Sequence, residues 1–446
     1  MTESPIKPAK GWVNAPADAK EFIVPLCNGL VRRPCLILQN EDGQYDRVAI
    51  YKSKKDAEPI VMLKNNDFAE TLLDEVLLDD GSKKDVVRSY FAYNIAPDGT
   101  SAKVWFGSAM DFNNDSLFHP KELLKEINEN VGYVPAVAIS LNGSKDPEAQ
   151  MINHTSWEHY TAWQSRAMHY LIDTNGYEVV FSHIHNVDCL GHYHWESAYM
   201  PENPELGKVF EGFMERAYVD TDKYLGSFMP YLDQGWNIFI VSDHGLVCKD
   251  KEIPALGDPF GVNVKVMKEL GYTVLKKDEN GEDLREIDWS KTTAVAPRGN
   301  HIYLNLKSRD PERGIVSDEE RYDLETKIIS DLYNYRWKGK DRIVSIAMRN
   351  KEAALLGLAG PYTGDILYWN EEGFNRIHGD SLSTYYGYAD TSVSPIFMAA
   401  GEAIKEACKT TRVIRQVDVA PTIAAIGGVR MPSTCEGAVI YQILAE

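Results

Sequence analysis

The distribution of apolar residues changes near residue 110. Before that point, short apolar runs typical of β-strands alternate with polar turns, and no long helical period appears. We therefore expect residues 1–112 to form a β-rich module or insertion, behind a proline-broken lead-in that ends near residue 18. The expected strands are Glu21–Leu26, Arg47–Tyr51, Pro59–Leu63, Val86–Tyr93 and Ala102–Phe106.

Beyond about residue 120, helical patterns alternate with buried apolar runs. Such alternation is typical of a doubly wound, mostly parallel α/β sheet, which we expect over residues 113–446. The expected helices are Pro120–Ile127, a second that Ser156 could cap and that ends near Asp173, and Pro204–Leu232. The expected strands are Tyr177–His185 and Trp236–Val241.

A charged, turn-rich stretch interrupts this core. We expect an α+β insertion at about 268–350, with a strand at His301–Leu306 and a helix at Ser317–Tyr333. The core is expected to resume at Asp365–Trp369 and Pro395–Ala400, and a helix at Asp418–Ile426 follows near the end.

Charge and composition narrow the function classes. The net charge is −19, with 47 Lys and Arg against 66 Asp and Glu, which argues against nucleic-acid and anionic-membrane partners. The six cysteines form no CxxC pair, and the N-terminus has no apolar signal region. We therefore expect a cytoplasmic protein, although the true N-terminus could lie upstream. The sequence does not indicate an oligomeric state.

Metal-ligand residue types follow two of the apolar runs. Asp188 and His192 stand four residues apart after one run, and Asp243 and His244 are adjacent after another. In open α/β sheets, ligands bind beyond the carboxyl ends of the strands. We expect Asp188, His192 and the later His378 to hold one divalent ion, and Asp243 with His244 to hold a second. Zinc is the first expectation and manganese the alternative.

Each of these residues could instead be a helix cap or an ordinary hydrogen-bonded polar residue. The spacing of the two motifs, each after a buried run, favours the metal site. Arg298 and His301 stand at a loop before a strand and could contact an anionic substrate, or lie in a solvent-facing turn. His183, His185 and His194 could orient a ligand, but are more simply polar or core residues.

Several short motifs are spread over roughly residues 120–446. They are DxxGH at Asp188–His192, SDHG at Ser242–Gly245, His378-Gly379, Ser394-Pro395-Ile396-Phe397 with Gly401, Asp418–Thr422, Met431-Pro432 and Cys435-Glu436-Gly437. With these motifs the chain resembles the alkaline phosphatase superfamily, and within it the type I phosphodiesterase and nucleotide pyrophosphatase branch. Sulfatases share the SDHG tetrad, but none of the cysteines here begins their CxPxR motif.

This resemblance implies a two-metal phosphohydrolase acting on a small phosphate ester, phosphodiester or nucleotide-like substrate through a Thr or Ser nucleophile. In that family the nucleophile and one further metal-binding Asp come early, and we find neither here. Thr155 and Ser156 precede a predicted helix, but helix capping explains them. We expect a C-terminal portion of a longer enzyme, and we expect this chain alone to be weakly active or inactive. The alternatives are a catalytically dead metal-binding pseudoenzyme or interaction module and, less strongly supported, a phosphomutase of the same superfamily.

Overall fold

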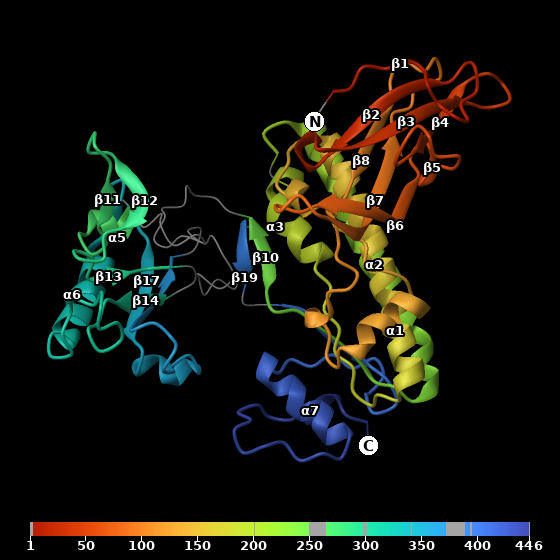
Figure 1. Ribbon diagram of the computed structural model, residues 1–446. Coiled ribbons are helices and arrows are strands. Elements are labelled where there is room, and N and C mark those ends of the chain that lie inside the picture. The colour runs from red at the N-terminus through yellow and green to blue at the C-terminus, as the bar shows by residue number, and fades with distance from the viewer. Residues whose placement is uncertain are drawn as a thin grey trace. The chain divides into compact units, whose positions relative to one another are not determined.

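The computed structural model describes two compact units, Met1–Pro230 and Tyr231–Glu446. Figure 1 colours the chain from red at the N-terminus to blue at the C-terminus. The domain boundaries predicted near residues 112, 268 and 350 are not tested by this division at Pro230 and stay predictions. The described residues are 3–199, 201–248, 265–297, 301–339, 341–371, 389–392 and 395–445.

The first unit begins with the predicted β-rich module, which forms two antiparallel sheets (Figure 1). Their inward-facing apolar residues make one core that includes Cys35, Ile37, Val48 and Tyr90. The first sheet has the order β1 (Lys7–Pro8), β2 (Lys20–Leu26), β3 (Val31–Gln39), β4 (Tyr45–Ile50) and β5 (Val61–Lys64). The second has β6 (Phe68–Leu77), β7 (Lys83–Tyr93) and β8 (Lys103–Phe106).

A buried ionic network joins the two sheets. Asp74 of β6 accepts hydrogen bonds from Arg33 of β3, at 3.0 Å from Nε, and from Arg88 of β7, at 3.2 Å from Nε. The Tyr90 hydroxyl also donates to this carboxylate. Arg33 and Asp74 are each 1% exposed. Because buried charges are tolerated only when paired and hydrogen-bonded, the four side chains depend on one another.

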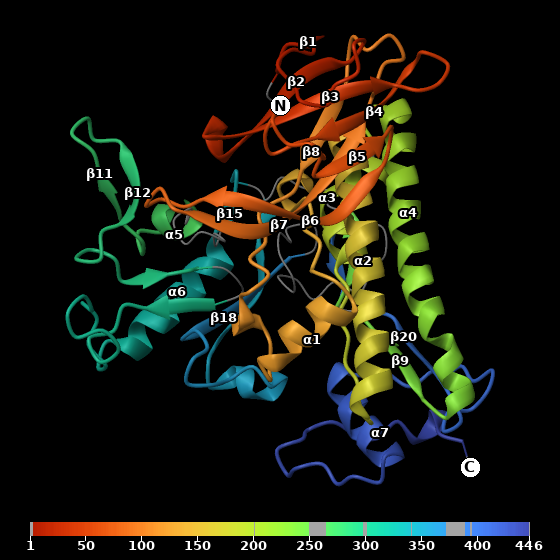
Figure 2. The same ribbon diagram turned by 45° about the vertical axis from the view of Figure 1, so that its right-hand side comes forward.

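The α-helices in the described residues of the first unit are α1 (Glu122–Asn130), α2 (Pro147–Asn175), α3 (Asn186–Tyr199) and α4 (Pro204–Phe228). The long helices α2 and α4 run side by side (Figure 2), and α3 packs on α4. Helix α2 begins earlier than predicted, because Asp146 caps it by accepting from the Glu148 amide at 3.0 Å. Ser156 is therefore not a cap but a fully buried residue inside the helix.

The strand predicted at Tyr177–His185 is wrong. This segment has no regular structure, and none of the ladders among the described residues includes it. Val179 and Phe181 are 70% and 84% exposed. Side-chain contacts hold the segment instead, since Gln164 of α2 donates to the His183 carbonyl at 2.7 Å. Apolar composition suits a strand, but a strand also needs a neighbour to pair its backbone.

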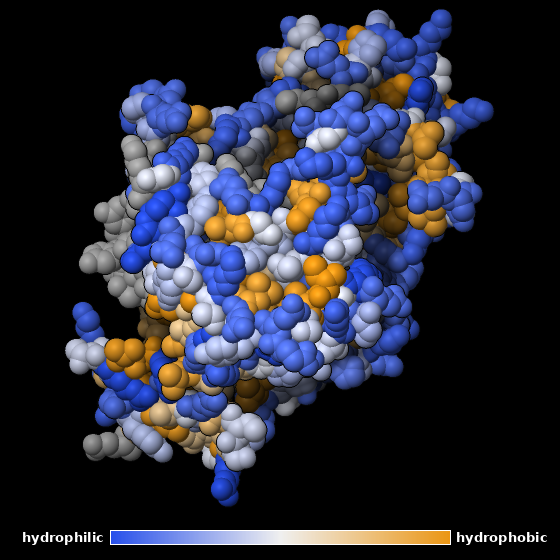
Figure 3. All heavy atoms as spheres, turned by 90° about the vertical axis from the view of Figure 1, so that its left-hand side faces the viewer, coloured by the Kyte–Doolittle hydropathy of each residue, from blue (hydrophilic) through white to orange (hydrophobic). Residues whose placement is uncertain are grey.

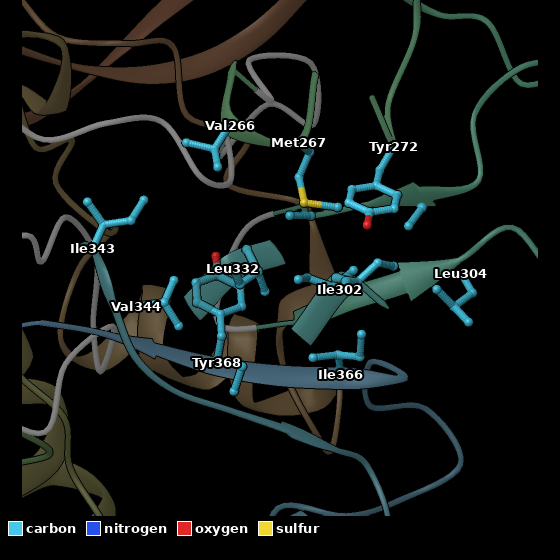
Figure 4. Close-up of a cluster of buried hydrophobic side chains, with 14 of the residues drawn as sticks. Val266, Met267, Tyr272, Ile302, Leu304, Leu332, Ile343, Val344, Ile366 and Tyr368 are labelled. Carbon is cyan, nitrogen blue, oxygen red and sulfur yellow. The ribbon is translucent and has the colours of Figure 1, made fainter. Parts of the chain in front are cut away.

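Within the second unit, one hydrophobic core combines residues of the predicted insertion with Ile366 and Tyr368, which lie beyond it. The segment Asp365–Trp369, where the main sheet was expected to resume, pairs antiparallel with two strands of the predicted insertion instead. Figure 4 shows Val266, Met267, Ile302 and Ile366 converging from helix and strand elements. The helices are α5 (Lys265–Glu269) and α6 (Arg321–Asn334). One sheet has the order β13 (Ala294–Val295), β14 (His301–Leu304), β18 (Ile366–Asn370) and β17 (Val344–Arg349). Two hairpins pair β11 (Leu275–Lys277) with β12 (Asp283–Ile287), and β15 (Arg336–Trp337) with β16 (Asp341–Arg342).

The other strands and the other α-helix in the described part of the second unit are β9 (Ile238–Val241), β10 (Gly245–Cys248), β19 (Ala389–Ser392), β20 (Phe397–Ala400) and α7 (Val419–Ile426). Strand β9 pairs with β20 and β10 with β19, both antiparallel. The fold is therefore mixed α/β, but the ladders between strands in the described ranges are antiparallel rather than a doubly wound parallel sheet. Pairing partners lie far apart in sequence, which periodicity does not reveal.

The face of the molecule shown in Figure 3 agrees with the charged composition. The face in Figure 3 carries mainly hydrophilic residues, with small hydrophobic groups between them. Among the described residues, no helix is both long enough and apolar enough to span a bilayer.

Candidate metal centre

Asp188 and His192 meet at the start of α3. Asp188 stands in the first turn and His192 one turn later, so both side chains lie on one face of the helix. His192 Nε2 lies 3.0 Å from Asp188 Oδ1, and the two side chains are 28% and 27% exposed. The predicted helical turn thus places a carboxylate oxygen and an imidazole nitrogen side by side at a partly open position.

The packing of α3 against α4 sets the position of this pair. Leu190 and Phe210 are fully buried in the core between the helices, together with Met214. At the first turn of α3, Asn186 is 1% exposed and its amide donates to the Ala217 carbonyl of α4 at 3.3 Å. The sequence reasoning missed Asn186. An Asn at the start of a helix is a common cap signal, and the partner of Asn186 on α4 is 31 residues away.

Asp243 and His244 lie in the second unit, between β9 and β10. The His244 Nδ1 atom is 2.9 Å from the Gly245 carbonyl. Because a carbonyl only accepts, Nδ1 carries the proton in the neutral ring, and Nε2 keeps the lone pair that a metal needs. Asp243 Oδ2 lies 3.8 Å from this Nε2. Gln416 holds the turn by donating to the Ser242 carbonyl at 3.0 Å.

Two of the other predicted site residues, His378 and Arg298, lie outside the described residues. His301 begins β14, where its Nδ1 accepts from the Gly364 amide at 3.3 Å. Burial lowers the pKa of His301, so its neutral form is favoured. In that form Nε2 carries the proton and can donate a hydrogen bond.

Neither Thr155 nor Ser156 has the surroundings of a nucleophile. Both lie inside α2. The Ser156 hydroxyl is fully buried, donates to the Asn153 carbonyl at 2.7 Å and accepts from the Ala138 amide at 2.9 Å. Thr155 accepts from Arg216 at 3.3 Å. Their hydrogen bonds are those of residues that tie a helix to its neighbours.

Two histidines for which sequence alone gave no clear role are core residues. His154 is 1% exposed and His194 is fully buried, and they pack against Phe213 and Phe210 of α4. Burial lowers the pKa of His154 to about 3 and that of His194 to about 4. Both rings are therefore neutral near pH 7. The structural interpretation of His194 holds, and His154 needs no functional one.

Comparison with known proteins identifies a family. Neither the curated proteins nor the solved structures gave a match to this chain. A family model described as type I phosphodiesterase / nucleotide pyrophosphatase matches residues 51–375. The matched range contains both the DxxGH and the SDHG motif, and it begins inside the β-rich module. The chain therefore belongs to the type I phosphodiesterase / nucleotide pyrophosphatase family of the alkaline phosphatase superfamily.

Proposed function

We propose that this chain is a phosphohydrolase that uses two divalent metal ions to act on a small phosphodiester or nucleotide-like substrate. Family membership supports phosphoric ester hydrolysis, typically with metal ions, on substrates of this class. The observation that carries the proposal is the Asp188–His192 pair, with ligand-type atoms 3.0 Å apart at the start of α3.

The donor set fits a divalent ion. Two ligands at ~2.1 Å from a tetrahedral zinc lie about 3.4 Å apart, close to the observed Asp188–His192 spacing. The positive N-terminal end of α3 also favours the ionised carboxylate of Asp188 in its first turn. We assign His378 as the third ligand of this ion, and Asp243 with His244 to the second ion. Zinc is the expected metal and manganese the alternative.

The bound ions would supply charge stabilisation for the phosphoryl oxygens and activate a hydroxyl group. The chain's own residues orient the ligands and the substrate. The Gly245 carbonyl fixes the His244 tautomer with the proton on Nδ1, so Nε2 is the proposed metal ligand. His301 is held with Nδ1 as acceptor, so its Nε2–H is assigned to a substrate oxygen. Arg298 is the proposed neighbouring cation for the substrate phosphate.

A paired assay tests the proposal. The purified chain is given bis(p-nitrophenyl) phosphate with Zn²⁺ or Mn²⁺, and metal affinity is measured in parallel by calorimetry. Asp188→Asn and His192→Ala are expected to lower metal affinity and hydrolysis by at least tenfold. Glu122→Gln and His119→Ala are matched controls, because Glu122 is an exposed carboxylate in the first turn of α1 and His119 is an exposed imidazole.

The outcomes separate the candidate functions. Hydrolysis that depends on Asp188 and His192 supports the phosphohydrolase. Metal binding at these residues without hydrolysis is expected both for the pseudoenzyme and for a phosphohydrolase that lacks its nucleophile, and the buried Ser156 and helix-bound Thr155 agree with either. If the wild-type chain shows no affinity for either metal, the proposed function is wrong.

A further inference from the structure

Asn186 occupies a special position in α3. It is the first residue of the helix, two residues before Asp188 and six before His192. Its Oδ1 atom accepts from the Val187 amide at 2.9 Å, which satisfies one of the free amides at the helix start. With only 1% of its surface exposed, the side chain cannot exchange these partners for water.

The other contacts of Asn186 lead to α4. Its Nδ2 donates to the Ala217 carbonyl at 3.3 Å, and the Thr221 hydroxyl lies 3.1 Å from its Oδ1. The same hydroxyl is 2.9 Å from the Ala217 carbonyl, so its single proton is shared between two acceptors. Asn186, Ala217 and Thr221 thus form a closed polar contact between the start of α3 and the middle of α4.

We propose that Asn186, supported by Thr221, is a positioning residue for the metal pair. The inference rests on the proposed function of Asp188 and His192 as ligands. Apolar packing between α3 and α4 tolerates small rotations and slides, whereas two hydrogen-bonded contacts at the first turn fix both. A ligand pair must be held within about 0.5 Å of its working geometry. Asn186 supplies that constraint for Asp188 and His192.

If Asn186 only stabilised the packing of α3 on α4, its replacement would have a different effect. Loss of a helix–helix hydrogen bond lowers the stability of the whole unit, but leaves the ligand geometry unchanged in the molecules that remain folded. Loss of a positioning contact changes metal affinity and coordination geometry at temperatures far below unfolding. Polar partners that orient metal ligands typically contribute 10–100-fold in affinity.

Cobalt is the probe, because its visible absorption reports coordination geometry. The full chain is titrated with Co²⁺, and the signal of His192→Ala is subtracted to isolate this site. Asn186→Ala is expected to weaken Co²⁺ binding 10–100-fold and to alter the band shape. Thr221→Val is expected to weaken Co²⁺ binding less than Asn186→Ala does. Thr221→Ser keeps the hydroxyl and is expected to bind Co²⁺ like the wild type.

Thr174→Val is the matched control. Thr174 on α2 makes the same bond to the carbonyl four residues earlier, 2.6 Å from Tyr170, but lies at the exposed end of its helix. It is expected to leave Co²⁺ binding unchanged. The inference is overturned if Asn186→Ala and Thr221→Val fold and bind Co²⁺ with wild-type affinity and spectrum. Should Asn186→Ala fail to fold, the Thr221→Val and Thr221→Ser pair decides the question.

The experiment distinguishes the assignment of Asp188 and His192 as metal ligands from the positioning role of Asn186. If wild type and His192→Ala give the same Co²⁺ signal, the ligand assignment itself is wrong. If His192→Ala abolishes the signal while Asn186→Ala and Thr221→Val do not change it, the ligand assignment stands and only the positioning role is wrong.

Discussion

Glu21 shows how one buried carboxylate couples stability to pH. Burial opposes its charge, but hydrogen bonds from Lys54, Trp12 and the Lys10 amide outweigh this and lower its pKa to about 2. A carboxyl whose pKa is lower in the folded state than in the unfolded state stabilises the fold fully when the pH is above its unfolded-state pKa. This contribution is lost as the pH falls through the folded-state pKa. The window here runs from about 4.5 down to about 2.

We predict that Glu21→Gln lowers the free energy of unfolding by on the order of 3 kcal/mol near pH 7. The difference from wild type should shrink as pH falls through this window, because both proteins then carry a neutral side chain. Urea unfolding at pH 3, 4, 5 and 7 measures it. Glu41→Gln, at an exposed position, is the control. A difference independent of pH would show that lost packing, rather than charge, is responsible.

The proposed ligand His192 leads to a second pH prediction. Only neutral imidazole coordinates a metal, so protons compete with the ion at low pH. We predict that the Zn²⁺ affinity of the chain falls at least tenfold between pH 7.5 and 5.5, and that His192→Ala weakens this dependence. Isothermal titration at the two values measures it. Equal affinities would exclude histidine ligation at this pair.

For single residues, the sequence predicted those contacts that depend only on the spacing of neighbouring residues. Residues four apart on a helix must share a face, so the Asp188–His192 contact was predictable. The role of Ser156 was not, because a Ser at a helix start and a buried Ser inside a helix look alike in sequence. Asn186 was missed because its proposed positioning role depends on Thr221, a partner in another helix.

At the scale of elements, one carboxylate at the start of α7 binds the C-terminal tail by hydrogen bonds. Asp418 is 1% exposed and accepts from the Ala438 amide at 2.9 Å, from the Arg415 amide at 3.1 Å and from the Arg412 side chain at 3.0 Å. Thr422 adds a contact by accepting from the Ile440 amide at 3.0 Å. These bonds hold residues 436–440 against the start of the helix.

We predict that Asp418→Asn detaches this tail from α7. The new amide nitrogen would face N–H groups that donate hydrogen bonds, so it could not accept them as the carboxylate does. The expected loss is roughly 2 kcal/mol of local stability. Limited proteolysis, read by mass spectrometry, should show faster cleavage within residues 436–445. Glu402→Gln, an exposed change in the same unit, is expected to cleave at the wild-type rate. Identical cleavage in Asp418→Asn would mean that apolar contacts of Ile440 suffice.

Element types were more predictable than element pairing. Strands β2, β4, β5, β7 and β8 and the helices α4, α6 and α7 lie close to their predicted ranges, since each has a clear period and clear end signals. Strands β1, β3 and β6 were not predicted. The predicted strand at Tyr177–His185 is wrong because composition does not reveal whether a neighbour exists. The parallel sheet was inferred from alternation alone, whereas β9 pairs antiparallel with β20, more than 150 residues later.

For the molecule as a whole, the two units have separate hydrophobic cores. Phe210 is fully buried in the first unit and Ile302 in the second. We predict that Phe210→Ala and Ile302→Ala affect different calorimetric transitions. Each should lose about 2–5 kcal/mol in its own unit, from lost burial and the cavity left behind. If both substitutions lowered a single transition equally, the units would unfold as one cooperative body.

The buried network around Asp74 constrains how this chain can change over generations. Replacing Arg33, Arg88 or Asp74 alone leaves a buried charge without its partner, at a cost of about 3–5 kcal/mol. Simultaneous replacement by apolar residues of similar volume would be nearly neutral. A lineage that changes one position at a time must therefore pass through unstable intermediates. Descendants are expected to keep Arg33, Asp74, Arg88 and Tyr90 together or to have lost them together, with few mixed combinations.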